Sequence, residues 1–159
     1  SCTDMKKTLF SVITCGLLIP ALADDPKIPR QPSPKGAKVM IILPRDGKTV
    51  KGPVRVAFGI KGMGVCPAGL VLPDGKPKEN TGHHHLLVDT EKLPSLGLPL
   101  VASKTLLHFG GGQTEVTLDL PPGKHTLQLV FADYAHIPHN PPVVSKKYTI
   151  TVAPKGAKK

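Results

Sequence analysis

The sequence predicts an all-β protein, built as a single antiparallel immunoglobulin-like β-sandwich of about seven strands. Three observations predict this. The chain has 159 residues, enough for one ordinary domain and too few for two. Its 18 prolines and 16 glycines are spread along the chain and divide it into short pieces. Several of these pieces alternate apolar and polar residues, the period of a half-buried strand.

Five segments carry the strand signal. Residues 53–60 show it most clearly, because every second side chain is apolar. The other four segments are residues 39–43, 115–120, 124–133 and 147–152. Turn sequences rich in Gly, Pro and Asp separate them, and the alternating apolar faces are expected to form the two inner layers. No segment has a convincing helical repeat, although residues 90–96 have room for one helical turn.

The first 23 residues are predicted to be an export signal preceded by a few upstream residues. Two lysines follow Met5, an apolar run occupies residues 8–23, and the run ends in the small-residue pattern Ala21-Leu22-Ala23. Cleavage after Ala23 would place the mature protein in the periplasm or outside the cell. A lipoprotein signal using Cys15 is the alternative, but Thr14 fits that pattern poorly.

The rest of the chain divides into three parts. Residues 24–38 are expected to be a Pro- and Lys-rich tether, residues 39–153 the sandwich domain, and residues 154–159 a basic tail. The formal net charge is +10, and the basic ends suggest contact with anionic envelope surfaces, or simply a solvated charge. Export and an aromatic content of 4% argue against nucleic acid as a partner. Cys66 is the only cysteine after the export signal, so no disulfide is expected within the mature chain.

Histidines are the informative residues of this domain. All seven follow the tether, and three are consecutive, at positions 83 to 85. On a strand, His83 and His85 point to one face and His84 to the other. A His-x-His pair offers two nitrogens to a metal ion, and a third can come from a loop. The candidate metal ligands are therefore His83, His85, His108, His136 and His139.

Copper or zinc is the metal that such imidazoles favour. Asp89, Glu115 and Asp133 are candidates for orienting the ligands through hydrogen bonds. The competing interpretation is that the histidines only satisfy backbone groups of their loops, since no established zinc-binding spacing is present. His125 lies in an alternating segment with Leu127 and is expected to be a core histidine with its hydrogen bonds satisfied.

Three blocks of the sequence resemble the DUF4399 family of small exported bacterial proteins. The blocks are NTGHHHLLVD at residues 80–89, LHFGGGQTE at residues 107–115 and DYAHIPHNPPV at residues 133–143. The resemblance extends over residues 43–152. It implies an exported single domain and supplies no mechanism.

The sequence is compatible with two functions, and it supports a third less well. The first is an exported module that binds copper or zinc through its clustered histidines. The second is a non-catalytic module that binds an envelope protein or polymer and uses the histidines as a hydrogen-bonded network. An enzyme with an open three-histidine metal site and Glu115 as general base ranks third, because no sequence feature specifies a substrate pocket.

Overall fold

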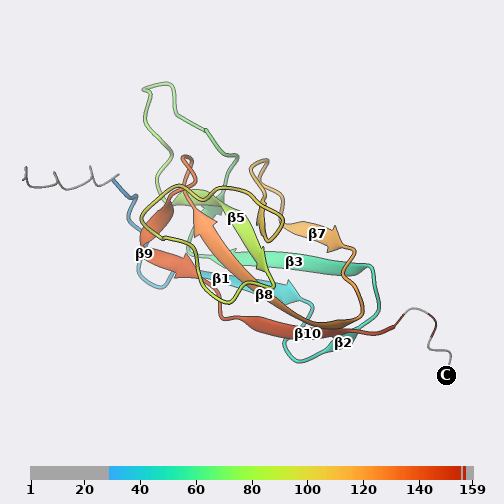
Figure 1. Ribbon diagram of the computed structural model, residues 1–159. Helices are drawn as coiled ribbons and strands as arrows, with labels where there is room; N and C mark the ends of the chain where they lie inside the picture. The colour runs from blue at the N-terminus through green and yellow to red at the C-terminus, as the bar shows by residue number, and fades with distance from the viewer. Residues whose placement is uncertain (1–28, 155, 157–159) are drawn as a thin grey trace, which may run out of the picture.

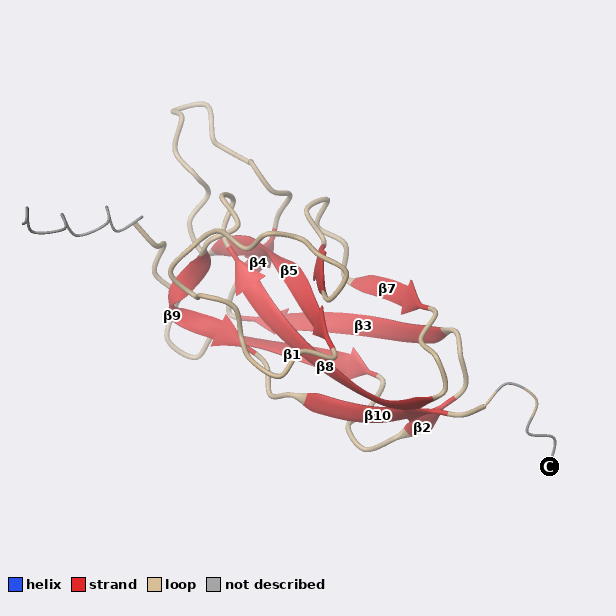
Figure 2. Cartoon of the chain, in the orientation of Figure 1, coloured by secondary structure: helices blue, strands red, loops and turns tan. Residues whose placement is uncertain are grey.

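A computed structural model describes residues 29–154 and 156 of the chain. This part is all-β, with ten strands and no helix (Figure 2). Residues 90–96 form bends and turns instead of the expected helical turn. Within the described residues no helix has the length and apolar character to cross a membrane. The predicted export signal, Cys15 and residues 24–28 of the predicted tether lie outside the described residues.

The smaller sheet has three antiparallel strands in the order β1-β3-β7. Their bounds are Lys38–Leu43, Val54–Lys61 and Glu115–Leu118. Each falls within two residues of a segment that the apolar alternation predicts. The alternation in β3 is matched by its burial, because Val54, Val56 and Phe58 are all buried.

The larger sheet has seven strands, and its central pair is β5 and β8 (Figure 1). Strand β5 spans Thr81–Val88, and β8 spans Gly123–Ala132. The outer strands are β2 (Thr49–Val50), β4 (Gly64–Val65), β6 (Leu106–His108), β9 (Pro138–Val144) and β10 (Tyr148–Val152). Strands β4 and β6 pair with β5, β9 and β10 pair with β8, and β2 extends the sheet from β10.

This sheet is mixed, which corrects the expectation of a purely antiparallel fold of about seven strands. The pair β2–β10 and the pair β4–β5 are both parallel. Strands β2 and β4 are only two residues long, too short to show an alternating pattern. Periodicity predicts which residues form a strand and which face they share, but it contains no information on the direction of the partner.

One hydrophobic core joins the two sheets. It takes Val56 and Phe58 from the small sheet and Leu86, Leu127 and Leu129 from the large sheet, all at most 4% exposed. In Figure 1 the strands of the small sheet lie behind β8 and β5. Burying one such side chain contributes about 1.5–3 kcal/mol, so this layer supplies most of the apolar stabilisation.

The outer face of the large sheet is covered as well. The loop of residues 89–105, yellow in Figure 1, runs across β5 and β8 and places Leu100 against Leu87 and Val130. All eight residues of β5 are consequently buried. The side chains on both faces of β5 therefore lie out of contact with bulk water.

The described part of the predicted tether, residues 29–38, is attached to the domain. Pro32 bridges Asn140 of β9 in parallel, the Ser33 amide donates to the Asn140 carbonyl at 3.1 Å, and the Asn140 amide donates to the Gln31 carbonyl at 2.9 Å. The Arg30 guanidinium donates to the Pro138 carbonyl at 2.8 Å and also to the His139 carbonyl. Strand β1 already begins at Lys38, inside the segment expected as a tether.

Candidate metal centre

Strand β5 distributes the three consecutive histidines between its two faces, as the alternation predicts. His84 points inward with Leu86, while His83 and His85 point outward with Leu87. All three side chains are fully buried. The two outward rings lie 4.8 Å apart, measured between centroids.

His84 belongs to the main core. Its ring centroid lies 5.2 Å from that of Phe58 and 5.0 Å from that of Phe131. Neither ring nitrogen has a hydrogen-bond partner. Burial lowers the pKa of His84 to about 4. His84 is therefore a neutral imidazole on the face of β5 opposite to His83 and His85.

His108 joins the outward pair through the pairing of β6 with β5. It lies directly opposite His85 in the antiparallel register, with the two ring centroids 5.1 Å apart. Its Nε2 atom lies 3.2 Å from the Nε2 atom of His83. One ring nitrogen from each of His83, His85 and His108 lies within 4.8 Å of the others. These three residues could hold a metal ion.

Gly110 makes room for the ring of His108. A Cβ atom at this position would lie 2.3 Å from His108 Cε1 and 2.5 Å from His108 Nε2. No side chain could occupy that space without moving the imidazole. The glycine-rich turn thus serves a packing purpose next to the three histidines.

A fourth histidine, His136, comes from the turn between β8 and β9. Its ring centroid lies 4.6 Å from that of His108, 5.0 Å from that of His83 and 6.0 Å from that of His85. We call His83, His85, His108 and His136 the histidine cluster. His83 and His85 are fully buried, whereas His108 is exposed and His136 is half-buried. The cluster is therefore open to solvent on the side of His108.

Three of the four ring nitrogens on the buried members of the cluster lack a hydrogen-bond partner. Neither ring nitrogen of His85 has one, nor does Nδ1 of His83. Burial, and then the neighbouring histidines, lower the pKa of both His83 and His85 to about 3. At neutral pH these imidazoles are uncharged and have a free lone pair, the state that a metal ion requires of its ligand.

His139, the fifth candidate ligand, is used elsewhere. Its Nε2 atom lies 3.2 Å from the Thr81 carbonyl oxygen, its Nδ1 atom lies 3.5 Å from the Phe131 carbonyl oxygen, and its ring stacks on that of Phe131. Burial lowers its pKa. The structure therefore brings four of the five candidate ligands together and leaves His139 bonded to the backbone.

His125 is buried and satisfied, as the sequence predicts. Its Nδ1 atom lies 2.7 Å from a carboxylate oxygen of Asp89, and its Nε2 atom lies 2.8 Å from the Pro121 carbonyl oxygen. Burial opposes the charged form, but the hydrogen bonds to Asp89 and Pro121 and the charge of Asp89 outweigh it and raise the pKa of His125.

None of the three carboxylates expected to orient the ligands bonds to a ring of the histidine cluster. Asp89 bonds to His125, Glu115 pairs with Arg55, and Asp133 accepts from the amides of Ala135 and Ile137, both at 2.9 Å. Sequence proximity to a histidine was the only basis for that expectation. In a β-sheet, side chains close in sequence can point to opposite faces or lie in different turns.

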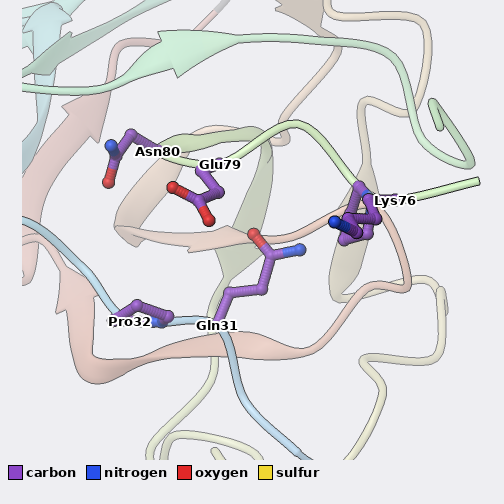
Figure 3. A pocket seen from close by; sticks show the side chains of 6 residues that line it. Gln31, Pro32, Lys76, Glu79 and Asn80 are labelled. Carbon is purple, nitrogen blue, oxygen red and sulfur yellow. The ribbon is translucent and has the colours of Figure 1, made fainter. Parts of the chain in front are cut away.

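A pocket that the sequence does not signal lies between the N-terminal segment and the loop from β4 to β5. It measures about 250 Å³ and is lined by Gln31, Pro32, Lys76, Pro77, Glu79 and Asn80 (Figure 3). The Nε2 atom of Gln31 is buried without a partner, and Figure 3 shows this side chain standing between Glu79 and Lys76. No member of the histidine cluster lines this pocket.

Comparison with known proteins yields one match. The model of a family described as a domain of unknown function, DUF4399, matches residues 56–153, more than half of the chain. The matched segment contains every member of the histidine cluster. Neither a curated protein nor a solved structure matches.

Proposed function

The chain belongs to the DUF4399 family, whose description names no activity, and we propose that it is a metal-binding module in which His83, His85 and His108 hold a copper or zinc ion. The observation that carries the proposal is His85, fully buried with neither ring nitrogen paired. Buried polar groups in proteins nearly always have a partner, and one that lacks a partner calls for an explanation.

The cost of leaving these nitrogens unpaired is substantial. Each buried polar atom without a partner costs about 1–3 kcal/mol. The outer face of β5 has three such atoms, one on His83 and two on His85. An ion bound between the rings would give one nitrogen of His85 a partner and would remove part of this cost.

The spacing of the nitrogens supports the same conclusion. Zinc–nitrogen bonds of about 2.0–2.1 Å at a tetrahedral angle place two ligand nitrogens about 3.3–3.4 Å apart. His83 Nε2 and His108 Nε2 are already 3.2 Å apart. One ring nitrogen from each of the three histidines lies within 4.8 Å of the others, close to the spacing that a tetrahedral ion requires.

Copper and zinc are the ions that fit this donor set. Imidazole nitrogen suits both, and copper(II) binds such sites more tightly than the other divalent metals of its row. Cys66 does not add a thiolate, because its buried sulfur lies 3.2 Å from the Thr81 hydroxyl oxygen. The set therefore lacks the soft sulfur ligands that select copper(I).

The proposal extends to location and fold on the strength of the sequence. The export pattern at residues 1–23 supports a module that works in the periplasm or outside the cell, and the basic ends support contact with anionic envelope surfaces. Two sheets around one core support an immunoglobulin-like sandwich. The alternative, an envelope-binding module with hydrogen-bonded histidines, describes His125 and His139 but leaves the unpaired nitrogens of His85 unexplained.

Metal retention by the purified protein tests the proposal. The protein is loaded with Zn²⁺ or Cu²⁺ and desalted, and metal per chain is measured by elemental analysis. We expect about one ion per chain, and loss of that ion in His85→Ala and in His83→Ala. His125→Gln, changed at a buried histidine outside the cluster, is the control and should retain the ion. Equal retention by His85→Ala, or none by the unaltered protein, would overturn the proposal.

Two neighbouring glycines offer a finer test. An added Cβ at Gly110 would meet the His108 ring at 2.3 Å, whereas one at Gly111 would meet only the end of the Gln113 side chain, at 2.9 Å. Gly110→Ala should therefore weaken metal binding by displacing the ring, and Gly111→Ala should leave it unchanged. Isothermal titration with Zn²⁺ compares the two; identical affinities would remove His108 from the site.

A further inference from the structure

We infer that His136 is a fourth ligand, so that the metal site is closed by four imidazoles and holds its ion instead of offering an open position to a substrate. This inference rests on the proposed metal site and specifies its coordination. Its basis is the position of the His136 ring beside those of His108 and His83, at centroid distances of 4.6 and 5.0 Å. The ring lies farther from His85, at 6.0 Å, so it joins the site by rotating about its side-chain bonds.

The backbone of His136 is held in place by the turn around Asp133. The Asp133 carboxylate accepts from the amides of Ala135 and Ile137, each at 2.9 Å. The Asp133 carbonyl accepts from the amide of His136 at 3.0 Å, and the Asp133 amide donates to the Ile137 carbonyl at 3.0 Å. Asp133 is thus a positioning residue, buried and bonded on both sides of His136.

The turn holds His136 in a conformation that a non-glycine residue rarely adopts. Its φ angle is +66°, in the left-handed region. Such backbone strain persists where the surrounding structure imposes it, and it is concentrated at functional sites. A glycine would adopt this φ angle without strain, so the backbone of the turn does not itself require a histidine at this position.

The covering loop is bonded to the same residue. The Leu100 amide donates to the His136 carbonyl at 2.9 Å, and the Leu100 side chain is buried against the sheet. His136 therefore lies where the loop of residues 89–105 meets the β8–β9 turn. Its ring packs edge-on against that of His83, which has no exposed surface.

A closed site makes a chemical prediction. Four imidazoles complete a tetrahedral set, whereas a three-histidine site keeps a position for water or an added anion. Four imidazoles also fill the equatorial positions of a tetragonal Cu²⁺ ion, so azide finds only a weak axial position in the unaltered protein. Removing the His136 side chain opens an equatorial position, and azide then binds the metal directly.

Azide binding to the Cu²⁺-loaded protein is the test. Azide bound to copper(II) gives a charge-transfer absorption band, which we expect in His136→Gly and not in the unaltered protein. Glycine is chosen because it keeps the backbone at its φ angle of +66°, so the turn remains formed. Free imidazole should occupy the vacated position in His136→Gly and suppress the azide band. We also expect the Zn²⁺ affinity of His136→Gly to fall by at least roughly 10–100-fold. Removing a residue that only hydrogen-bonds to a metal ligand costs that much, and removing a ligand should cost more.

The outcomes separate the two proposals. An azide band of equal strength in both proteins, with metal bound by both, overturns the role of His136 and leaves the three-histidine site standing. Absence of metal from the unaltered protein overturns the proposed function itself. Asp133→Asn supplies an independent check: a positioning role predicts a weak azide band with copper still bound, and no change in that variant would contradict it.

Discussion

His125 and His85 are both buried histidines on the central strands of one sheet, yet their surroundings are opposite. Both ring nitrogens of His125 have partners, Asp89 at 2.7 Å and Pro121 at 2.8 Å, whereas His85 has none. The pKa of His125 is raised, and that of His85 is lowered to about 3. Burial alone therefore does not decide what a histidine does; its polar partners do.

The chemistry behind this difference is simple. Both partners of His125 are oxygen acceptors, so both bonds form only when each ring nitrogen carries a proton. His125 is thus built to be an imidazolium ion. The cluster around His85 has no carboxylate bonded to it among Asp89, Glu115 and Asp133, and its rings are built to stay neutral. Neutral rings can bind a metal ion, and a charged ring cannot.

Acid should affect the metal-free protein most strongly. The pKa values of His83, His84 and His85 lie at about 3, 4 and 3 in the folded protein and at their ordinary value of 6.5 when unfolded. Between these values the unfolded chain binds more protons, so stability falls as the pH drops below 6.5. Each residue contributes up to about 1.4 kcal/mol per pH unit, several kcal/mol together by pH 5. Urea unfolding at pH 7 and pH 5 measures this, and equal midpoints would contradict it.

Metal should have the next largest effect. An ion at a free concentration 100 times its Kd stabilises the folded protein by about 2.7 kcal/mol, which corresponds to an increase in Tm on the order of 10 °C for a domain of this size. His85→Ala should show no increase, since the unpaired nitrogens of His85 carry the site. Thermal unfolding with and without Zn²⁺ measures both; an increase shared by His85→Ala would point to binding elsewhere.

Removal of the satisfied histidine should destabilise the protein without affecting metal binding. His125→Leu leaves the Pro121 carbonyl and one Asp89 oxygen without their partner, which we expect to cost about 1–3 kcal/mol. The native protein gains stability from the raised pKa of His125 only while the ring is protonated. The stability lost in His125→Leu should therefore be greatest below pH 6.5 and should shrink as the pH rises through the raised pKa of His125. Urea unfolding across pH 6 to 9 tests the sign.

Removal of an unpaired histidine from the core should have the smallest effect and the opposite sign. His84→Leu replaces two buried nitrogens that have no partner by apolar atoms next to Phe58 and Phe131. We expect stability to rise by about 1 kcal/mol, with Zn²⁺ binding unchanged because His84 faces away from the cluster. A destabilised His84→Leu would show that this imidazole has a polar partner in solution.

Much of the fold could be predicted from local pattern. The five segments that carry the strand signal, four alternating and one a short apolar run, became β1, β3, β7, β8 and β10, and the assignment of His83 and His85 to one face of a strand and of His84 to the other is confirmed. These features depend only on the two-residue period of a strand, which can be read without knowing its neighbours. The directions of the two-residue strands β2 and β4 could not be predicted in this way.

The composition of the cluster depended on long-range pairing. His108 lies beside His85 because β6 pairs with β5 in one register, and a shift by one residue would turn it to the other face. His136 lies there because of the turn built on Asp133, whereas His139, three residues later, bonds to Thr81. No local pattern distinguishes these three histidines.

By itself, the sequence determined that this chain is a β protein with a His-x-His pair on one side of a strand, because strand formation and side-chain alternation are local properties. Only the tertiary structure decided that the pair is fully buried, that three of its four ring nitrogens lack a hydrogen-bond partner, and that it meets His108 and His136. Burial, pairing and the resulting pKa values depend on which distant segments are packed together, and that is a property of the whole fold.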